Sequence, residues 1–185
     1  MSKGCDIGRL VRKAVAALTG AVLIGGLAAS LFLVPRPALA AEPAMISVAG
    51  GYFDVFHRRK PAAEATLEYR AGQSFFYFHP IAGIMGTSDH GGYVYAGVML
   101  DIPLFDHIWL TPSIAPGLYF QGGGKHLGYP VEFRSQIEVS YRFSGGSRLG
   151  VTYSHMSNAG LGHDNPGVEI AQISYAVPFD SIFGN

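Results

Sequence analysis

Three polar residues in the C-terminal part of the chain have the side chains of a hydrolytic triad. His155 and Ser157 stand two positions apart, and Glu169 follows Ser157 by twelve positions. An imidazole can take the proton of a serine hydroxyl, while a carboxylate holds the imidazole in the required tautomer and stabilises the imidazolium. In a β-strand, residues two apart point from the same face, about 7 Å apart at Cα. The residue types therefore suggest nucleophilic acyl chemistry if two neighbouring strands carry them.

The segments that carry these residues, 149–157 and 169–175, alternate between apolar and polar side chains. His155, Ser157 and Glu169 have the parity of the apolar residues of their own segments. Those apolar residues are Leu149, Val151, Tyr153, Ala171, Ile173 and Tyr175. If that face contacts lipid, ionisable groups on it are costly, and their presence there indicates a functional site. The alternative is that they lie among the lipid headgroups and only contact water.

Alternation with a period of two predicts that most of the chain is β-structure. It is strict over 132–143, where Phe133, Ser135, Ile137, Val139, Tyr141 and Phe143 form one face. The opposite face, together with that of 64–70, consists of Glu64, Thr66, Glu68, Arg70, Glu132, Arg134, Gln136, Glu138, Ser140 and Arg142. A soluble β-sandwich would turn the apolar face inward. Strands of about ten residues with aromatic residues near their ends instead favour a membrane barrel with a polar interior.

The predicted fold is all-β, an eight-stranded antiparallel up-and-down transmembrane β-barrel. We expect its strands near 45–57, 62–71, 74–85, 92–102, 107–120, 130–143, 147–157 and 168–179. The even count places both termini on the periplasmic side, with short connections at 72–73, 103–106 and 144–146. The connections at 58–61, 86–91, 121–129 and 158–167 then lie outside the cell. Side chains fill a barrel of this size, which argues against a diffusion channel. Inside it we expect an ion network of Glu68, Arg70, Glu132, Arg134, Glu138 and Arg142.

The first forty residues have the pattern of a secretory signal peptide. Four basic residues precede the apolar stretch 14–34, and Ala38-Leu39-Ala40 forms a small-x-small cleavage site. We expect cleavage after Ala40, which leaves 41–185 as the barrel domain; a retained membrane anchor is the alternative. The chain has its one cysteine, Cys5, in the part that would be lost, so the mature part would lack disulfides and thiol chemistry. With 8 basic and 12 acidic residues remaining, a nucleic-acid partner is not expected.

The residues around the triad also resemble a known family. Ser154-His155-Met156-Ser157-Asn158-Ala159-Gly160-Leu161, followed by Asn165-Pro166-Gly167-Val168-Glu169, is similar to the signature of the outer-membrane lipid A 3-O-deacylases of the PagL type. The resemblance implies a serine esterase that removes the ester-linked acyl chain at the 3-position of lipid A. By matching position, Ser157 is the nucleophile, His155 the base and Glu169 its orienting partner. The backbone N–H of Gly160 and the side chain of Asn165 would bind the oxyanion. Asn158 also matches, and we interpret it as a residue that orders the loop.

This reading makes lipopolysaccharide of the outer leaflet the substrate and the outer membrane the location. It predicts no cofactor and no metal, and leaves a homodimer open. Two alternatives are a non-catalytic barrel that serves as a wall, adhesin or receptor, and an acyltransferase or phospholipase with the same triad. The basic run Arg58-Arg59-Lys60, and less so Lys125 with His126, could contact lipid A phosphates; ordinary charged loops are the alternative.

Overall fold

The computed structural model describes residues 42–56 and 60–184. The predicted signal peptide and its cleavage site therefore lie outside the described residues, as do Arg58 and Arg59 of the basic run. The strands are β1 (Met45–Phe53), β2 (Ala62–Arg70), β3 (Phe78–Thr87), β4 (Gly92–Leu100), β5 (Ile102–Pro103), β6 (Ile108–Phe120), β7 (Val131–Arg142), β8 (Arg148–Ser157) and β9 (Val168–Pro178). A short helix, α2 (Phe179–Phe183), follows β9. Among the described residues no helix is long and apolar enough to cross a membrane.

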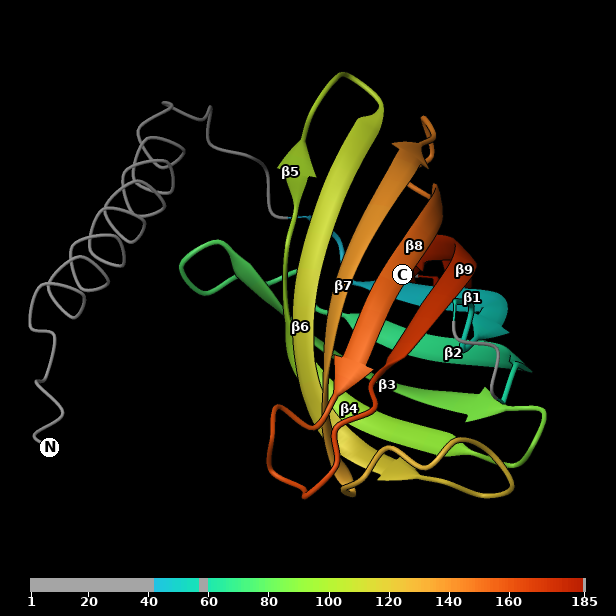
Figure 1. Ribbon diagram of the computed structural model, residues 1–185. Helices are drawn as coiled ribbons and strands as arrows, with labels where there is room; N and C mark the ends of the chain where they lie inside the picture. The colour runs from blue at the N-terminus through green and yellow to red at the C-terminus, as the bar shows by residue number, and fades with distance from the viewer. Residues whose placement is uncertain (1–41, 57–59, 185) are drawn as a thin grey trace, which may run out of the picture. The chain divides into compact units, whose positions relative to one another are not determined.

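The strands form one closed antiparallel sheet, which confirms the predicted eight-stranded barrel (Figure 1). Each long strand pairs with its sequence neighbours, and β1 pairs with β9 along its whole length. The two-residue β5 pairs with β6 just after β4, which also pairs with β6. Closure pairs each long strand with a neighbour on both sides, as strands in lipid require. We call the end with the connections 121–130 and 158–167 the loop end, and the other, where β1 begins and β9 stops, the turn end.

Two predicted boundaries differ from the structure by four residues, each because of a local backbone conformation, and the last strand ends one residue earlier than expected. The expected strand 45–57 stops at Phe53, because Asp54 has a φ of 62°. The expected strand 74–85 begins only at Phe78, because Phe76 and Tyr77 have φ values of 47° and 72° in a tight turn. The turn-end connection is thus 71–77 rather than 72–73. The expected strand 168–179 gives way to α2 at Phe179.

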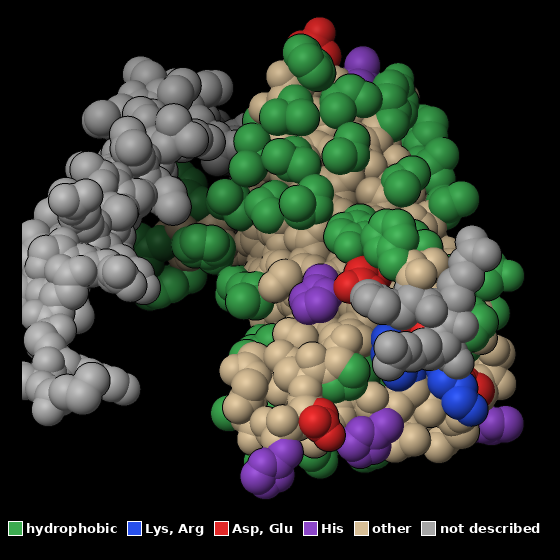
Figure 2. Space-filling model, viewed as in Figure 1, with side chains coloured by type: hydrophobic (Ala, Val, Ile, Leu, Met, Phe, Trp, Pro, Cys, Tyr) green, Lys and Arg blue, Asp and Glu red, His purple; other side chains and the backbone are tan. Residues whose placement is uncertain are grey.

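The predicted division between an apolar wall and a polar interior is confirmed. Apolar side chains cover much of the wall (Figure 2), while the polar set of β2 and β7, apart from Arg142, is buried inside. The luminal ion network joins Arg70 to Glu138 at 2.8 Å and to Glu68 at 2.9 Å, and Arg134 to Glu68 at 2.8 Å. Because opposite charges face each other, each of these four buried groups has a partner of opposite charge.

Two of the expected members do not join this network. Arg142 lies at the turn end with a side chain 28% exposed, and it pairs with Glu42 at 2.8 Å and contacts the Trp109 ring. It stands on the last position of β7, where the lumen opens. Glu132 is fully buried, but within the described part of the chain neither of its carboxylate oxygens has a hydrogen-bond partner. It lies two positions before Arg134 on the luminal face of β7, and the buried Tyr93 donates its hydroxyl to the Glu132 backbone carbonyl.

Candidate active site

The pairing of β8 with β9 brings His155 and Glu169 together. The two residues are direct cross-strand partners, and the imidazole Nδ1 lies 3.3 Å from the carboxylate Oε1. Both side chains leave the outer face of the barrel, with exposed fractions of 49% for His155 and 14% for Glu169. Figure 2 shows a histidine next to an acidic side chain where the apolar wall gives way to polar side chains. The arrangement leaves the second imidazole nitrogen, Nε2, for another partner.

Ser157 is the last residue of β8 and is half-buried on the same face as His155. Its cross-strand partner on β7 is Phe133, and the partner of His155 on that side is Ser135. Ser135 is exposed and adds a second hydroxyl beside the imidazole; the sequence prediction assigned it only to the wall. Its parity within 132–143 was the signal that could have identified it.

The loop after Ser157 is ordered by Asn158, which is fully buried. Its Nδ2 donates to the carbonyls of Leu127 at 2.9 Å and Asp164 at 2.8 Å. Its backbone N–H donates to Oδ1 of Asn165 at 3.1 Å. A buried amide with this many partners holds two loops in one arrangement. This geometry agrees with the interpretation of Asn158 as a loop-ordering residue.

The two expected oxyanion donors differ in availability. The N–H of Gly160 donates to Oδ1 of Asn158 at 2.9 Å, so it can reach an anion only if that hydrogen bond opens. Asn165 accepts through Oδ1, which leaves its Nδ2 group as a donor. Asn165 Nδ2 is therefore the more available donor of the two, whereas the Gly160 N–H already has a partner, which the sequence analysis did not expect.

Gly167 is a residue near the site that sequence reasoning did not single out. It has a φ of 58°, and a Cβ added to it would lie 2.8 Å from Cε1 of His155. The backbone of Gly167 therefore packs against the imidazole, and a larger residue would displace the ring. The available signal was a glycine between Pro166 and the start of β9, a position that commonly requires a left-handed backbone.

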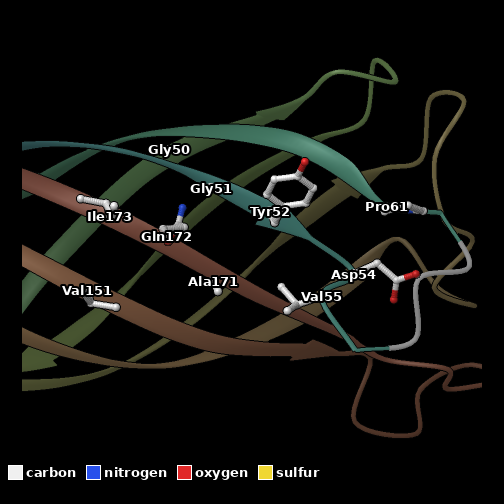
Figure 3. A pocket seen from close by; sticks show the side chains of 10 residues that line it. All are labelled: Gly50, Gly51, Tyr52, Asp54, Val55, Pro61, Val151, Ala171, Gln172 and Ile173. Carbon is white, nitrogen blue, oxygen red and sulfur yellow. The ribbon is translucent and has the colours of Figure 1, made fainter.

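An apolar groove of about 720 Å³ is lined by residues of β1, β8 and β9 and of the segment after β1 (Figure 3). Ala171 lines it two residues along β9 from Glu169, and Gly50 leaves its floor without a side chain. The backbone N–H of Val55, at the loop end of the groove, donates to the carbonyl of Glu169 at 3.1 Å. The other lining residues are Gly51, Tyr52, Asp54, Pro61, Val151, Gln172 and Ile173. The groove can hold an apolar chain that runs along the barrel wall.

The closed sheet with its apolar exterior defines an outer-membrane β-barrel, with a histidine, a serine and a glutamate on its outer face. A family model described as lipid A 3-O-deacylase (PagL) matches residues 39–178, and the chain belongs to this family. The predicted family resemblance is thereby confirmed.

The chain is similar to two curated relatives, both called lipid A deacylase PagL. It is 36% identical over 55 residues to that of Bordetella bronchiseptica, which covers 30% of this chain and 31% of the relative. It is 36% identical over 56 residues to that of Pseudomonas aeruginosa, which covers 30% of this chain and 32% of the relative. These alignments thus span less than a third of the length of the relatives.

Two solved structures share the fold. The crystal structure of the outer membrane enzyme PagL superposes with a TM-score of 0.58 at 20% identity, covering 72% of this chain and 99% of that one. A de novo designed transmembrane β-barrel superposes with a TM-score of 0.54 at 14% identity, covering 75% and 98%. At these identities the likeness supports the barrel architecture.

Proposed function

We propose that this protein is a serine esterase of the outer membrane that hydrolyses the ester-linked acyl chain at the 3-position of lipid A. The observation that carries the proposal is the contact of 3.3 Å between His155 Nδ1 and Glu169 Oε1 on the outer wall, two residues from a serine on the same face. Membership of the lipid A 3-O-deacylase family supports the choice of substrate.

In the proposed reaction, Ser157 Oγ attacks the ester carbonyl carbon while His155 Nε2 takes the hydroxyl proton. Glu169 holds the imidazole through Nδ1 and stabilises its charged form. The side-chain Nδ2 of Asn165 donates to the oxyanion of the tetrahedral intermediate. When the intermediate collapses, His155 returns the proton to the sugar oxygen that leaves, and the acyl group stays on Ser157. Water, activated by His155, then releases the fatty acid and restores the serine.

The apolar groove supports a lipid substrate, because its lining residue Val55 bonds to the Glu169 carbonyl and its lining residues Val151 and Ile173 are exposed on the apolar wall. An acyl chain whose carbonyl lies at Ser157 could follow this groove without leaving an apolar environment. Ser157, His155 and Glu169 come from one chain, so the proposed reaction does not require a dimer.

The test is to express the full chain in a Gram-negative host of known lipid A structure and to analyse lipid A by mass spectrometry. We expect loss of one 3-hydroxyacyl chain, which Ser157→Ala and His155→Asn abolish. Ser144→Ala, in the connection between β7 and β8 at the turn end, is the matched control and should retain activity. Unchanged lipid A from a folded barrel would refute the proposal. Transfer of the chain to another lipid, or release from phospholipid instead, would establish the transferase or phospholipase alternative.

A further inference from the structure

A buried ion pair connects two elements at the loop end of the barrel. Lys125, in the connection between β6 and β7, places its Nζ 2.6 Å from Oδ1 of Asp54, just beyond β1. Their side chains are only 7% and 0% exposed. Tyr119 donates its hydroxyl to the Lys125 carbonyl at 2.9 Å, and the Lys60 N–H donates to Oδ2 of Asp54 at 3.0 Å. Both partners are therefore held in place from two sides.

Asp54 precedes a residue that bonds to Glu169; Glu169 and its neighbours form what we call the glutamate side of the proposed active site. The next residue, Val55, donates its backbone N–H to the carbonyl of Glu169 at 3.1 Å. Asp54 itself has a φ of 62°, which residues other than glycine rarely adopt. An ion pair that holds Asp54 in this conformation therefore also determines where the Val55 N–H meets Glu169.

Lys125 is connected through Leu127 to the residue after Ser157; Ser157 and Asn158 form what we call the serine side of the site. Two residues further on, the carbonyl of Leu127 accepts a hydrogen bond of 2.9 Å from Asn158, which follows Ser157. The ladder between β8 and β9 ends at the pair Met156 and Val168, one residue before Ser157. Ser157 is still paired with Phe133 of β7, so its position relative to Glu169 depends on that pairing and on the loop contacts rather than on a partner in β9.

We propose that Asp54 and Lys125 are positioning residues that set the serine and glutamate sides of the active site relative to each other. This inference rests on the proposed triad. In this role Asp54, which also lines the loop end of the groove, acts through Val55 on Glu169, and Lys125 acts through Leu127 and Asn158 on Ser157. Breaking the pair leaves the barrel closed, because the strand ladders are intact, but loosens the triad.

The experiment measures the rate at which a fluorophosphonate probe labels Ser157 in the purified full chain, and kcat and KM on lipid A in micelles. For Lys125→Met we expect labelling and kcat to fall about 10- to 100-fold, since displacements of about 1 Å at a catalytic group have effects of this size. The KM should stay within about twofold. Asp54→Asn should behave alike, and the double variant should be no slower than either single one, because both changes break one contact.

A second buried ion pair provides a matched control. Arg148 Nη1 lies 2.9 Å from Asp101 Oδ2 at the turn end, with exposed fractions of 1% and 5%. Arg148→Met should lower the thermal unfolding temperature at least as much as Lys125→Met while labelling stays at the wild-type rate. The inference is overturned if Lys125→Met labels as fast as wild type, or if Arg148→Met slows labelling equally. A wild-type protein that is not labelled at Ser157 would instead refute the proposed function itself.

Discussion

Replacing Gly167 by alanine should place a methyl group against the imidazole of the proposed base. The new Cβ would lie 2.8 Å from Cε1 of His155, whereas carbon atoms in contact prefer about 3.5–4.0 Å. The ring must therefore move by about 1 Å. Because the His155 side chain is 49% exposed, it can move outward without unfolding the barrel. A displacement of this size corresponds to about 100-fold in rate, or about 2.7 kcal/mol in the activation barrier.

The change also puts alanine at a φ of 58°, which costs about 1–2 kcal/mol of stability and needs its own control. Gly146→Ala, at a φ of 83° in a turn-end connection, has similar backbone strain far from the site. The assay compares initial rates of 3-acyl release from lipid A in micelles, with folding checked by the heat-dependent shift in gel mobility. Gly146→Ala should keep the wild-type rate. A folded Gly167→Ala protein that is as active as wild type, or no less active than Gly146→Ala, would refute the argument.

Four further predictions concern the site and the wall. Asn158→Ala leaves the buried carbonyl of Leu127 and the part-buried carbonyl of Asp164 without their donor, so we expect a loss of about 1–3 kcal/mol in unfolding experiments and at least tenfold lower activity. Glu169→Gln keeps the size of the side chain but removes its charge, and kcat should fall at least about 100-fold at unchanged stability. Arg70→Met removes the arginine that pairs with the buried carboxylates of Glu68 and Glu138. It should lower the free energy of unfolding in urea by about 3–5 kcal/mol, while the folded fraction is labelled normally by the fluorophosphonate. Leu67→Arg places a charge on the lipid-facing wall, where its side chain is 47% exposed, and should cost about 2–4 kcal/mol in folding into vesicles while leaving the activity of folded protein intact.

The sequence was most informative where a strand has one lipid-facing and one luminal side. Alternation in 132–143 correctly predicted that Glu138 points inward and Ile137 outward, because side chains of a strand alternate with a period of two. The parity of His155 and Glu169 likewise predicted their place on the outer wall. Boundaries were less predictable, because Asp54, Phe76 and Tyr77 adopt a positive φ, which is uncommon for any residue other than glycine.

The amino-acid sequence by itself determined the fold class, the faces of the strands and the residue types that could perform acyl chemistry, since all three depend on local composition and periodicity. Only the tertiary structure decided the register that sets His155 opposite Glu169; a slip of one residue would turn one of them into the lumen. It also decided that Gly167 packs on the imidazole, that the Gly160 N–H is occupied, and that Lys125 meets Asp54 across 71 residues of chain. Such contacts follow from how the barrel closes, and no local pattern in the sequence encodes that closure.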